Sequence, residues 1–286
     1  IIKQSESLVL AQIEGYTKKG EVKVSVLKNL CGKRLPKKIK LSYFYLLDLC
    51  SISGGHGVEF EFGDADSLYL FIKKNKGYRI STPTSGYAKI KEGKVYATYR
   101  HSYHMALVPQ KLYEKSMTAI FNNYHKLEYD TLWVKEYINN QVKNSVAGFE
   151  GDEIDEFFKQ HVALEMAYHT GTKIELERIT PFLSSDNPHA QISGIRAIWE
   201  NPEPDALEMI VNFIQDSTKE GFPRVIGMQY LDFQDAREYK TRLEEILKTM
   251  SDTPSGFSGN LMDPRVCTRF PRSTRYALED LLEKWE

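Results

Sequence analysis

A helical phrase returns in the second half of the chain after 33 residues, where SGIRAIW at 193–199 is followed by IGMQYLD at 226–232. Apolar residues that recur every three or four positions indicate amphipathic helices. The pattern covers two successive helices and three copies, at shifts of 33 and 31 residues. A near-constant period of this length predicts a helical solenoid, in which helix pairs shelter the apolar faces of their neighbours. The aligned positions are Ile192, Ile195, Ile198, Leu207, Ile210, Phe213 and Ile214, then Val225, Met228, Leu231, Lys240, Leu243, Ile246 and Leu247, and upstream His161, Leu164, Ala167, Leu176, Ile179, Phe182 and Leu183.

The joint LSSDNPHAQISGIRAI resembles the start of a HEAT repeat, where a short Asp/Pro turn leads into a helix that carries an Arg. Asp186, Pro188 and Arg196 match this pattern, whereas the next joint keeps Pro223 and has Gln229 in place of the Arg. The resemblance implies a protein-binding scaffold, because HEAT-like arrays mostly bind proteins. We expect the contact surface on a concave face formed by the second helices of the pairs.

The first half of the sequence has a different period. Apolar and polar residues alternate over 22–26 and over 58–62, as in half-buried strands. Breakers such as CGKRLP, SGGHG and KEGK separate the runs, and no helical pattern begins before about residue 109. This pattern predicts a small closed barrel or sandwich. We therefore expect an α+β fold, with a β-barrel domain at 1–128 and an all-α repeat domain at 129–286.

The strand phrases SLVLAQIEGY, EVKVSVLKNL and KIKL, followed by FGDADSLYLFIKKNKGY, resemble the netrin-like domain shared with tissue inhibitors of metalloproteinases. The resemblance covers roughly the first third of the chain and implies a barrel of the oligonucleotide/oligosaccharide type. Those inhibitors place an N-terminal cysteine on the metal of their target. This chain begins with Ile1, Ile2 and Lys3, so the inhibitory activity does not carry over.

Charge is distributed unevenly along the chain. Residues 1–128 hold 21 Lys and Arg against 11 Asp and Glu, whereas residues 129–286 hold 17 against 28, although the net charge is only −1. Opposite signs in the two halves indicate either different roles or docking of one half on the other.

Nine basic residues lie between positions 18 and 40. They favour an alternative function, in which the barrel binds single-stranded nucleic acid or another polyanion. The structural explanation is that edge strands often carry Lys because charge prevents aggregation. We prefer the structural explanation, because Lys outnumbers Arg and no aromatic residue alternates with the bases.

Three groups of residues raise the question of a metal site. His101 and His104 lie three positions apart on a predicted strand, so their side chains point to opposite faces. His161 and His169 share a helix without nearby carboxylate or Cys ligands at metal spacing, and we expect His161 to be partly buried. The acidic run EGDEIDEFF at 150–158 lacks the spacing of a calcium loop. We interpret it as a helix start with Asp152 as the N-cap.

Cys31, Cys50 and Cys267 are too few for a disulfide framework. We do not expect Cys31 to pair with Cys50, because a simple hairpin would hold the two far apart. Cys50 and His56 form the best pair for a cysteine-dependent enzyme, but no third orienting group is evident. We interpret Cys50 as a small buried apolar residue.

These patterns together predict a non-enzymatic protein-binding scaffold without catalytic residues, metal or cofactor. Nucleic-acid or polyanion binding is the first alternative, and a cysteine-dependent enzyme is the second. The sequence opens IIKQSES without a Met, which would fit removal of a leader, so we expect an exported or lipid-anchored protein at the periplasm or cell surface. No apolar run approaches the roughly 20 residues of a membrane span. The sequence does not assign binding residues, the partner's identity or the oligomeric state.

Overall fold

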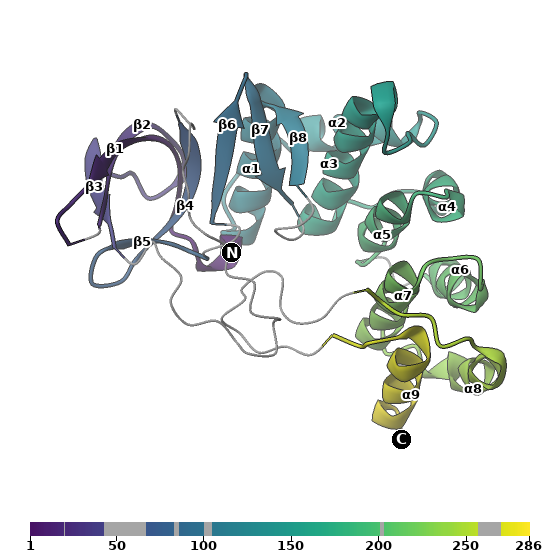
Figure 1. The fold of residues 1–286 in the computed structure, drawn as a ribbon. Coiled ribbons are helices and arrows are strands. Elements are labelled where there is room, and N and C mark those ends of the chain that lie inside the picture. Colours follow the sequence, from purple (N-terminus) through teal and green to yellow (C-terminus); the bar gives the residue numbers. More distant parts are fainter. Residues whose placement is uncertain (20, 43–66, 83–85, 100–104, 201–202, 257–269) are drawn as a thin grey trace. The chain divides into compact units, whose positions relative to one another are not determined.

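The computed structural model describes the chain except for residues 20, 43–66, 83–85, 100–104, 201–202 and 257–269 (Figure 1). The described chain forms two compact units, one from Ile1 to Val134 and one from Lys135 onward. We call them the barrel unit and the helical unit. The fold is α+β, as the sequence predicts.

Five strands of the barrel unit close into a barrel. They are β1 (Ser7–Tyr16), β2 (Val22–Gly32), β3 (Lys38–Leu41), β4 (Leu68–Lys74) and β5 (Tyr78–Ile80). Their order is β1-β2-β3-β5-β4, and β4 pairs with β1 to close the ring. All pairings are antiparallel except β3 with β5. This order is that of the predicted oligonucleotide/oligosaccharide-type barrel.

Alternation along the strands fills the barrel interior, because successive side chains point to opposite faces of a strand. The buried set is Val9, Ala11, Val22, Val24, Ile39, Leu41, Leu68, Leu70, Ile72 and Ile80. The predicted strand at 58–62 lies outside the described residues.

Three further strands extend from the barrel on the side of β4. β6 (Tyr87–Lys91) pairs with β4, β7 (Lys94–Thr98) pairs with β6, and β8 (Met105–Pro109) pairs with β7. The predicted KEGK turn joins β6 to β7, with φ of 53° at Glu92 and 74° at Gly93. Helix α1 (Gln110–Tyr124) begins directly after β8 and packs against β2, β7 and β8.

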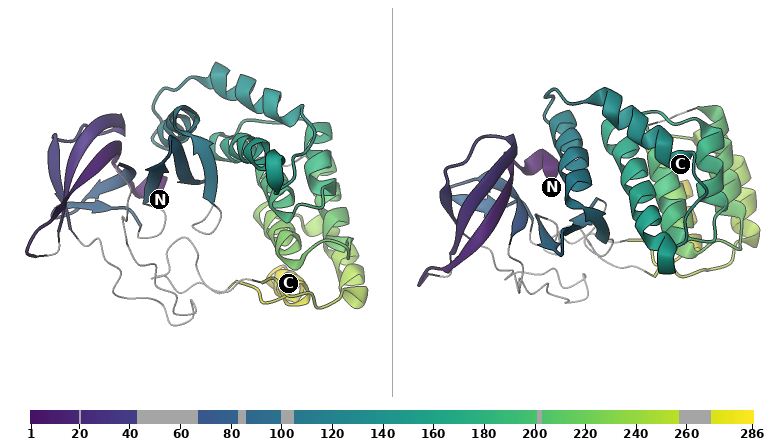
Figure 2. Two further views of the ribbon diagram at one scale, coloured as in Figure 1. Left: turned by 45° about the horizontal axis from the view of Figure 1, so that its top comes forward. Right: turned by 90° about the horizontal axis from the view of Figure 1, so that it is seen from above.

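The helical unit is an array of two helical layers (Figure 2). Helices α3 (Ile154–Thr170), α5 (Pro188–Ala197), α7 (Gly221–Phe233) and α9 (Thr274–Lys284) pack side by side in one layer. Helices α4 (Leu176–Ser184), α6 (Pro204–Gln215) and α8 (Lys240–Thr249) form the other layer and pack against α5, α7 and α9 respectively. Helix α2 (Thr131–Val142) precedes the array, and its Tyr137 hydroxyl donates to the carbonyl of Lys159 in α3 at 3.3 Å.

A repeated hydrogen bond ties each layered pair together. Helices end with carbonyls that lack an intrahelical partner. In each of α3, α5, α7 and α9, a side-chain donor in the first half of the helix reaches a backbone carbonyl at or just beyond the end of the preceding helix. The bonds are Gln160 Nε2 to Ser145 O at 2.7 Å, Gln191 Nε2 to Ser185 O at 2.6 Å, Arg224 Nε to Ile214 O at 2.9 Å and Arg275 Nη1 to Met250 O at 3.1 Å. The first three donors recur at the shifts of 31 and 33 residues that the apolar pattern shows.

These contacts correct the predicted pairing of the helices. The sequence pattern paired α3 with α4 and α5 with α6, but the helices that pack together are α4 with α5, α6 with α7 and α8 with α9. The layer in which successive repeats contact each other therefore consists of the first helices of the predicted pairs. The prediction that a partner contacts a concave face formed by the second helices stays a prediction.

Candidate functional site

Several residues considered from the sequence lie outside the described part of the chain. They are Cys50, His56, His101, His104 and Cys267. The predicted absence of a metal at His101 and His104, and the alternative of a Cys50 and His56 enzyme, stay predictions.

His161 and His169 take separate roles on α3. His161 is buried, and its Nδ1 lies 3.0 Å from the hydroxyl of Ser193 on α5. His169 Nε2 lies 3.9 Å from the carboxylate of Glu165. Among the described residues, no three His, Cys, Asp or Glu side chains are grouped so that they could hold a metal ion.

The acidic run at 150–158 starts α3, but not through the predicted cap. Asp152 lies in a 3₁₀ turn, Gly151–Glu153, and Glu153 is the N-cap residue. The Glu153 carboxylate accepts the backbone N–H of Gly148 at 2.5 Å, so it is directed toward the preceding loop. A hydrogen bond from Lys159 lowers the pKa of Glu156. The prediction of Asp152 as the cap was therefore wrong, while the acids Asp155 and Glu156 do occupy the first turn.

Cys31 is buried in the barrel unit and donates to the Thr118 hydroxyl at 3.4 Å. Burial raises the pKa of its thiol, so the reactive thiolate is disfavoured.

The basic segment forms partly neutralised strands. Lys28 pairs with Glu114, Lys33 with Glu6 and Lys38 with Glu14, at 2.7, 2.6 and 3.4 Å. Lys23 and Lys40, which are also exposed, lie directly opposite each other in the β2–β3 register, and Lys23 is close enough to the Glu14 carboxylate to help lower its pKa. Like charges in this position destabilise a sheet unless an anion screens them.

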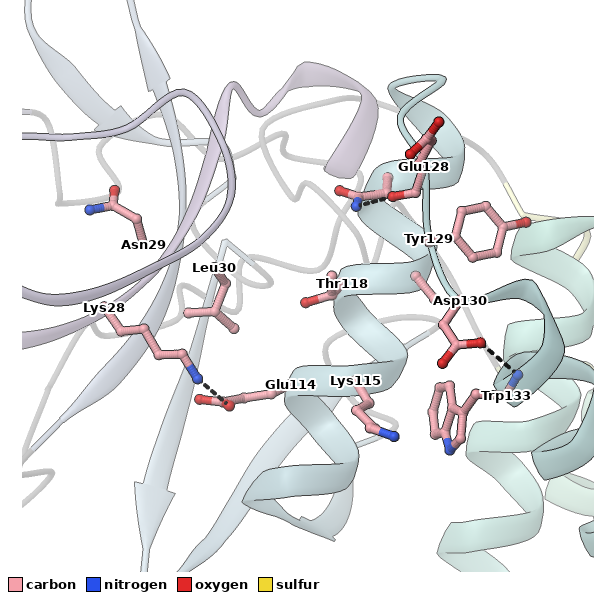
Figure 3. Close-up of a pocket in the computed structure, with 12 residues that line it drawn as sticks. Lys28, Asn29, Leu30, Glu114, Lys115, Thr118, Glu128, Tyr129, Asp130 and Trp133 are labelled. Carbon is pink, nitrogen blue, oxygen red and sulfur yellow. Dashed lines mark hydrogen bonds and ion pairs between the residues drawn. The ribbon is translucent and has the colours of Figure 1, made fainter.

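Two adjoining pockets lie beside β2 and α1 in the barrel unit. The first, which we call the Trp133 pocket, has a volume of about 360 Å³. Figure 3 shows Lys28 reaching Glu114 of α1 on one side of it, and Asp130 and Trp133 on the other. The Lys115 ammonium lies 4.8 Å from the centre of the Trp133 ring and covers one face.

The second, the Arg34 pocket, has a volume of about 780 Å³ and lies against the β2–β3 loop. Leu27, Leu35, Pro36 and Leu127 contribute its apolar wall, and Asn29, Leu30 and Asn122 belong to both pockets. Asn29 anchors the loop, because its side-chain Oδ1 accepts the N–H of Leu35 at 2.8 Å. Volumes of this size suit a small ligand or a few side chains of a partner.

The helical unit carries a cluster of aromatic residues and arginine at the C-terminal ends of α3, α5 and α7. The Arg196 guanidinium lies 3.9 Å from the centre of the Tyr168 ring. Trp199 contacts Tyr168, with ring centres 6.1 Å apart, and Phe233, with ring centres 5.5 Å apart. We call Tyr168, Arg196, Trp199 and Phe233 the Trp199 surface, because Phe233 is 58% exposed and the others are partly so.

A buried ion pair holds this surface in place. Arg196 Nε donates to both carboxylate oxygens of Glu165, at 3.0 and 2.9 Å, and Nη2 lies 2.9 Å from Oε2. Glu165 is fully buried in α3, so the guanidinium fixes α5 against α3. The Gln234 side chain donates to the carbonyl of Trp199 and joins the end of α7 to the same cluster.

The chain matches no protein-family model, no curated protein and no solved structure. None of the described helices is both long and apolar enough to span a membrane.

Sequence reasoning singled out Arg196 but missed its neighbours. Glu165 and Arg196 are 31 residues apart, as are Tyr168 and Trp199, so both pairs occupy equivalent positions in successive repeats. That spacing was a usable signal, because equivalent positions of stacked repeats lie side by side. The exposure of Phe233 has no such signal in the sequence.

Proposed function

We propose that the protein is a non-enzymatic scaffold whose helical unit binds another protein through the Trp199 surface. The observation that carries this proposal is an exposed Phe233 beside Trp199, Tyr168 and Arg196 at the shared end of three helices. Trp, Tyr and Arg are the residue types that dominate the binding energy of protein interfaces.

The ordering of the cluster also favours binding. Arg196 is held between the Glu165 carboxylate and the Tyr168 ring, so its rotamer is fixed before any partner arrives. A preorganised surface loses less side-chain entropy on association than a flexible one. Most of the free energy gained by burying the aromatic rings can therefore appear as binding affinity.

The experiment is quantitative affinity capture of soluble proteins from the source cells on the immobilised full-length chain. Phe233→Ala removes a ring that is 58% exposed, so we expect it to keep the fold, and Trp199→Ala tests the centre of the surface. We expect each to reduce retention of a specific partner by about thirtyfold. Tyr16→Ala is the matched control, because it removes an exposed ring from the barrel unit. Equal retention by wild type and Phe233→Ala would contradict the proposal.

A second candidate function rests on Lys23 and Lys40. Their exposed ammonium groups face each other across β2 and β3, and a phosphate backbone would relieve their repulsion. Barrels of this type bind oligonucleotides on the equivalent strands. We therefore propose polyanion binding by the barrel as the alternative.

Binding of a labelled single-stranded oligonucleotide at two salt concentrations tests this alternative. The affinity should fall steeply with salt, and the Lys23→Gln/Lys40→Gln variant should bind more weakly with a smaller salt slope. If the wild type binds the oligonucleotide only weakly and the Lys23→Gln/Lys40→Gln variant binds it equally well, polyanion binding at this site is excluded.

Netrin-like identity and export to the periplasm or cell surface are further proposals, and the strand phrases support the netrin-like identity. Fractionation of source cells tests export, and recovery with cytosolic markers would contradict it.

A further inference from the structure

The Arg34 pocket is lined by aliphatic side chains that are exposed and do not belong to the core of the barrel. Leu27 is 55% exposed and Leu127 is 47% exposed, and both line this pocket with Leu35 and Pro36. Contiguous apolar side chains at a hollow on the surface mark interaction sites more often than isolated ones do. The pocket is therefore shaped to receive aliphatic side chains.

The charge of the Arg34 pocket has one sign. Arg34 and Lys37 are exposed, and they are the charged residues among those described that line it. By contrast, Lys28 beside the Trp133 pocket is already paired with Glu114. Two bases without a lining acid complement a ligand that carries carboxylates.

Asn122 offers a hydrogen-bond acceptor where the two pockets meet. Its Nδ2 donates to the carbonyl of Glu128 at 2.8 Å, which fixes the orientation of the amide. Its Oδ1 is buried and has no hydrogen-bond partner among the described residues. An acceptor in this position calls for a donor such as a peptide N–H.

The Arg34 pocket is poorly suited to nucleic acid. No aromatic residue is among the described residues that line the Arg34 pocket, and Lys115 already covers a face of Trp133. Single-stranded nucleic acid gains much of its affinity from stacking on open aromatic faces. A peptide with aliphatic side chains fits the lining better.

We propose that the Arg34 pocket is a groove that binds an extended acidic peptide segment of another protein. Its aliphatic side chain packs against Leu27 and Leu127, its carboxylates pair with Arg34 and Lys37, and a backbone N–H donates to Asn122 Oδ1. Recognition of acidic motifs by basic clusters is a recurrent mode of peptide binding. This site lies in the barrel unit and is independent of the Trp199 surface.

The test is selection of a displayed random-peptide library on the full-length chain, followed by fluorescence polarisation with the selected peptides. We expect enriched peptides to combine Asp or Glu with Leu, Ile or Val. Arg34→Glu/Lys37→Glu should weaken their binding by about tenfold or more. Lys18→Glu/Lys19→Glu is the control, because it changes the net charge equally at bases that do not line either pocket. Asn122→Leu should weaken binding as well, with thermal unfolding used to confirm its fold.

Four outcomes would overturn the proposal: no enrichment over the Arg34→Glu/Lys37→Glu variant, enrichment of basic peptides, equal losses in the two charge variants, or unchanged binding by Arg34→Glu/Lys37→Glu. If that variant instead lost binding only to a single-stranded oligonucleotide or to phosphatidylserine vesicles, the groove would be a site for those anions and the peptide proposal would fail.

Discussion

Arg196 is the residue on which the packing of α3 against α5 depends most. Replacing it by Met keeps much of the side-chain volume but removes the guanidinium from the fully buried Glu165 carboxylate and leaves His169 Nε2, 3.9 Å away, as a basic group beside it. Breaking a buried ion pair from one side costs about 3–5 kcal/mol, because a buried charge is left uncompensated. We expect Arg196→Met to lower the free energy of unfolding by about 3 kcal/mol, as measured by urea denaturation.

The matched control removes both charges. The Glu165→Leu/Arg196→Met variant leaves no uncompensated charge, so it should recover most of the stability that Arg196→Met loses. A single variant as stable as wild type would contradict the assigned role of the pair.

Cys31 should behave as an unreactive thiol. Because burial raises its pKa, the folded protein holds the thiol proton more tightly than the unfolded chain does. The stability that this shift contributes is therefore fully present below the ordinary pKa of a thiol, and it is lost as the pH rises from that value through the raised pKa of folded Cys31. Iodoacetamide should label Cys31 more slowly in the native protein than in urea at the same pH, as peptide mapping by mass spectrometry can measure. Equal rates would be evidence against burial.

The sequence carried part of this residue-level information. The resemblance to a HEAT repeat pointed to Arg196, and the 31-residue shift leads from it to Glu165. Trp133 and Leu127 could not be found in this way, because their exposure and the pocket beside them depend on how α1 packs against β2. Alternation and helical periodicity describe faces of elements and do not describe hollows between them.

Gln160 of α3 makes one of the hydrogen bonds that join the end of one helix to the helix that follows it. Its side chain donates to Ser145 O and accepts from Ala147 N at 2.9 Å, and it is buried. Gln160→Leu leaves the buried N–H of Ala147 without its acceptor, and such a group costs about 1–3 kcal/mol, whereas the carbonyl of the exposed Ser145 can bind water instead. We expect a loss of about 2 kcal/mol or more in urea denaturation. Gln229→Leu, at an exposed position of α7, should change stability little, and equal effects would contradict the assigned role.

Gly227 lies where α6 crosses α7. A Cβ at this position would lie 3.2 Å from Ile214 Cγ1 and 3.3 Å from Ile210 Cγ2. Gly227→Ala gains helix propensity and adds this close contact, so it should change stability by less than about 1 kcal/mol. Gly227→Leu should cost about 2 kcal/mol or more, because the larger side chain forces the helices apart. Thermal unfolding of the two variants measures the difference, and similar values would show that the crossing is loosely packed.

The pairing of helices shows what a period can and cannot predict. The shifts of 31 and 33 residues are the same whether α5 is grouped with α4 or with α6, so the apolar pattern does not distinguish the two groupings. The polar positions Gln160, Gln191 and Arg224 do, because each donor reaches backward to the preceding helix end. In the barrel, alternation predicted the strands, while the parallel pairing of β3 with β5 required the structure.

At the scale of the whole molecule, the charge asymmetry follows from the two units. The bases of the first half include paired residues such as Lys28 and Lys38, as well as Arg34 and Lys37 at a pocket. The helical unit carries many acids, but the Trp199 surface is built from aromatic rings and a neutralised arginine. We therefore propose that the helical unit binds protein through these rings rather than through its net charge.

Photo-crosslinking at position 233 tests this assignment most directly. A benzoylphenylalanine in place of Phe233 preserves an aromatic ring at the most exposed position of the Trp199 surface, and the same group in place of Tyr16 is the control. We expect irradiation in source cells to crosslink position 233, and not position 16, to a discrete protein, and this crosslinked product should survive nuclease treatment. Crosslinks of equal yield at both positions, or crosslinks at position 233 that reach only nucleic acid, would contradict this expectation.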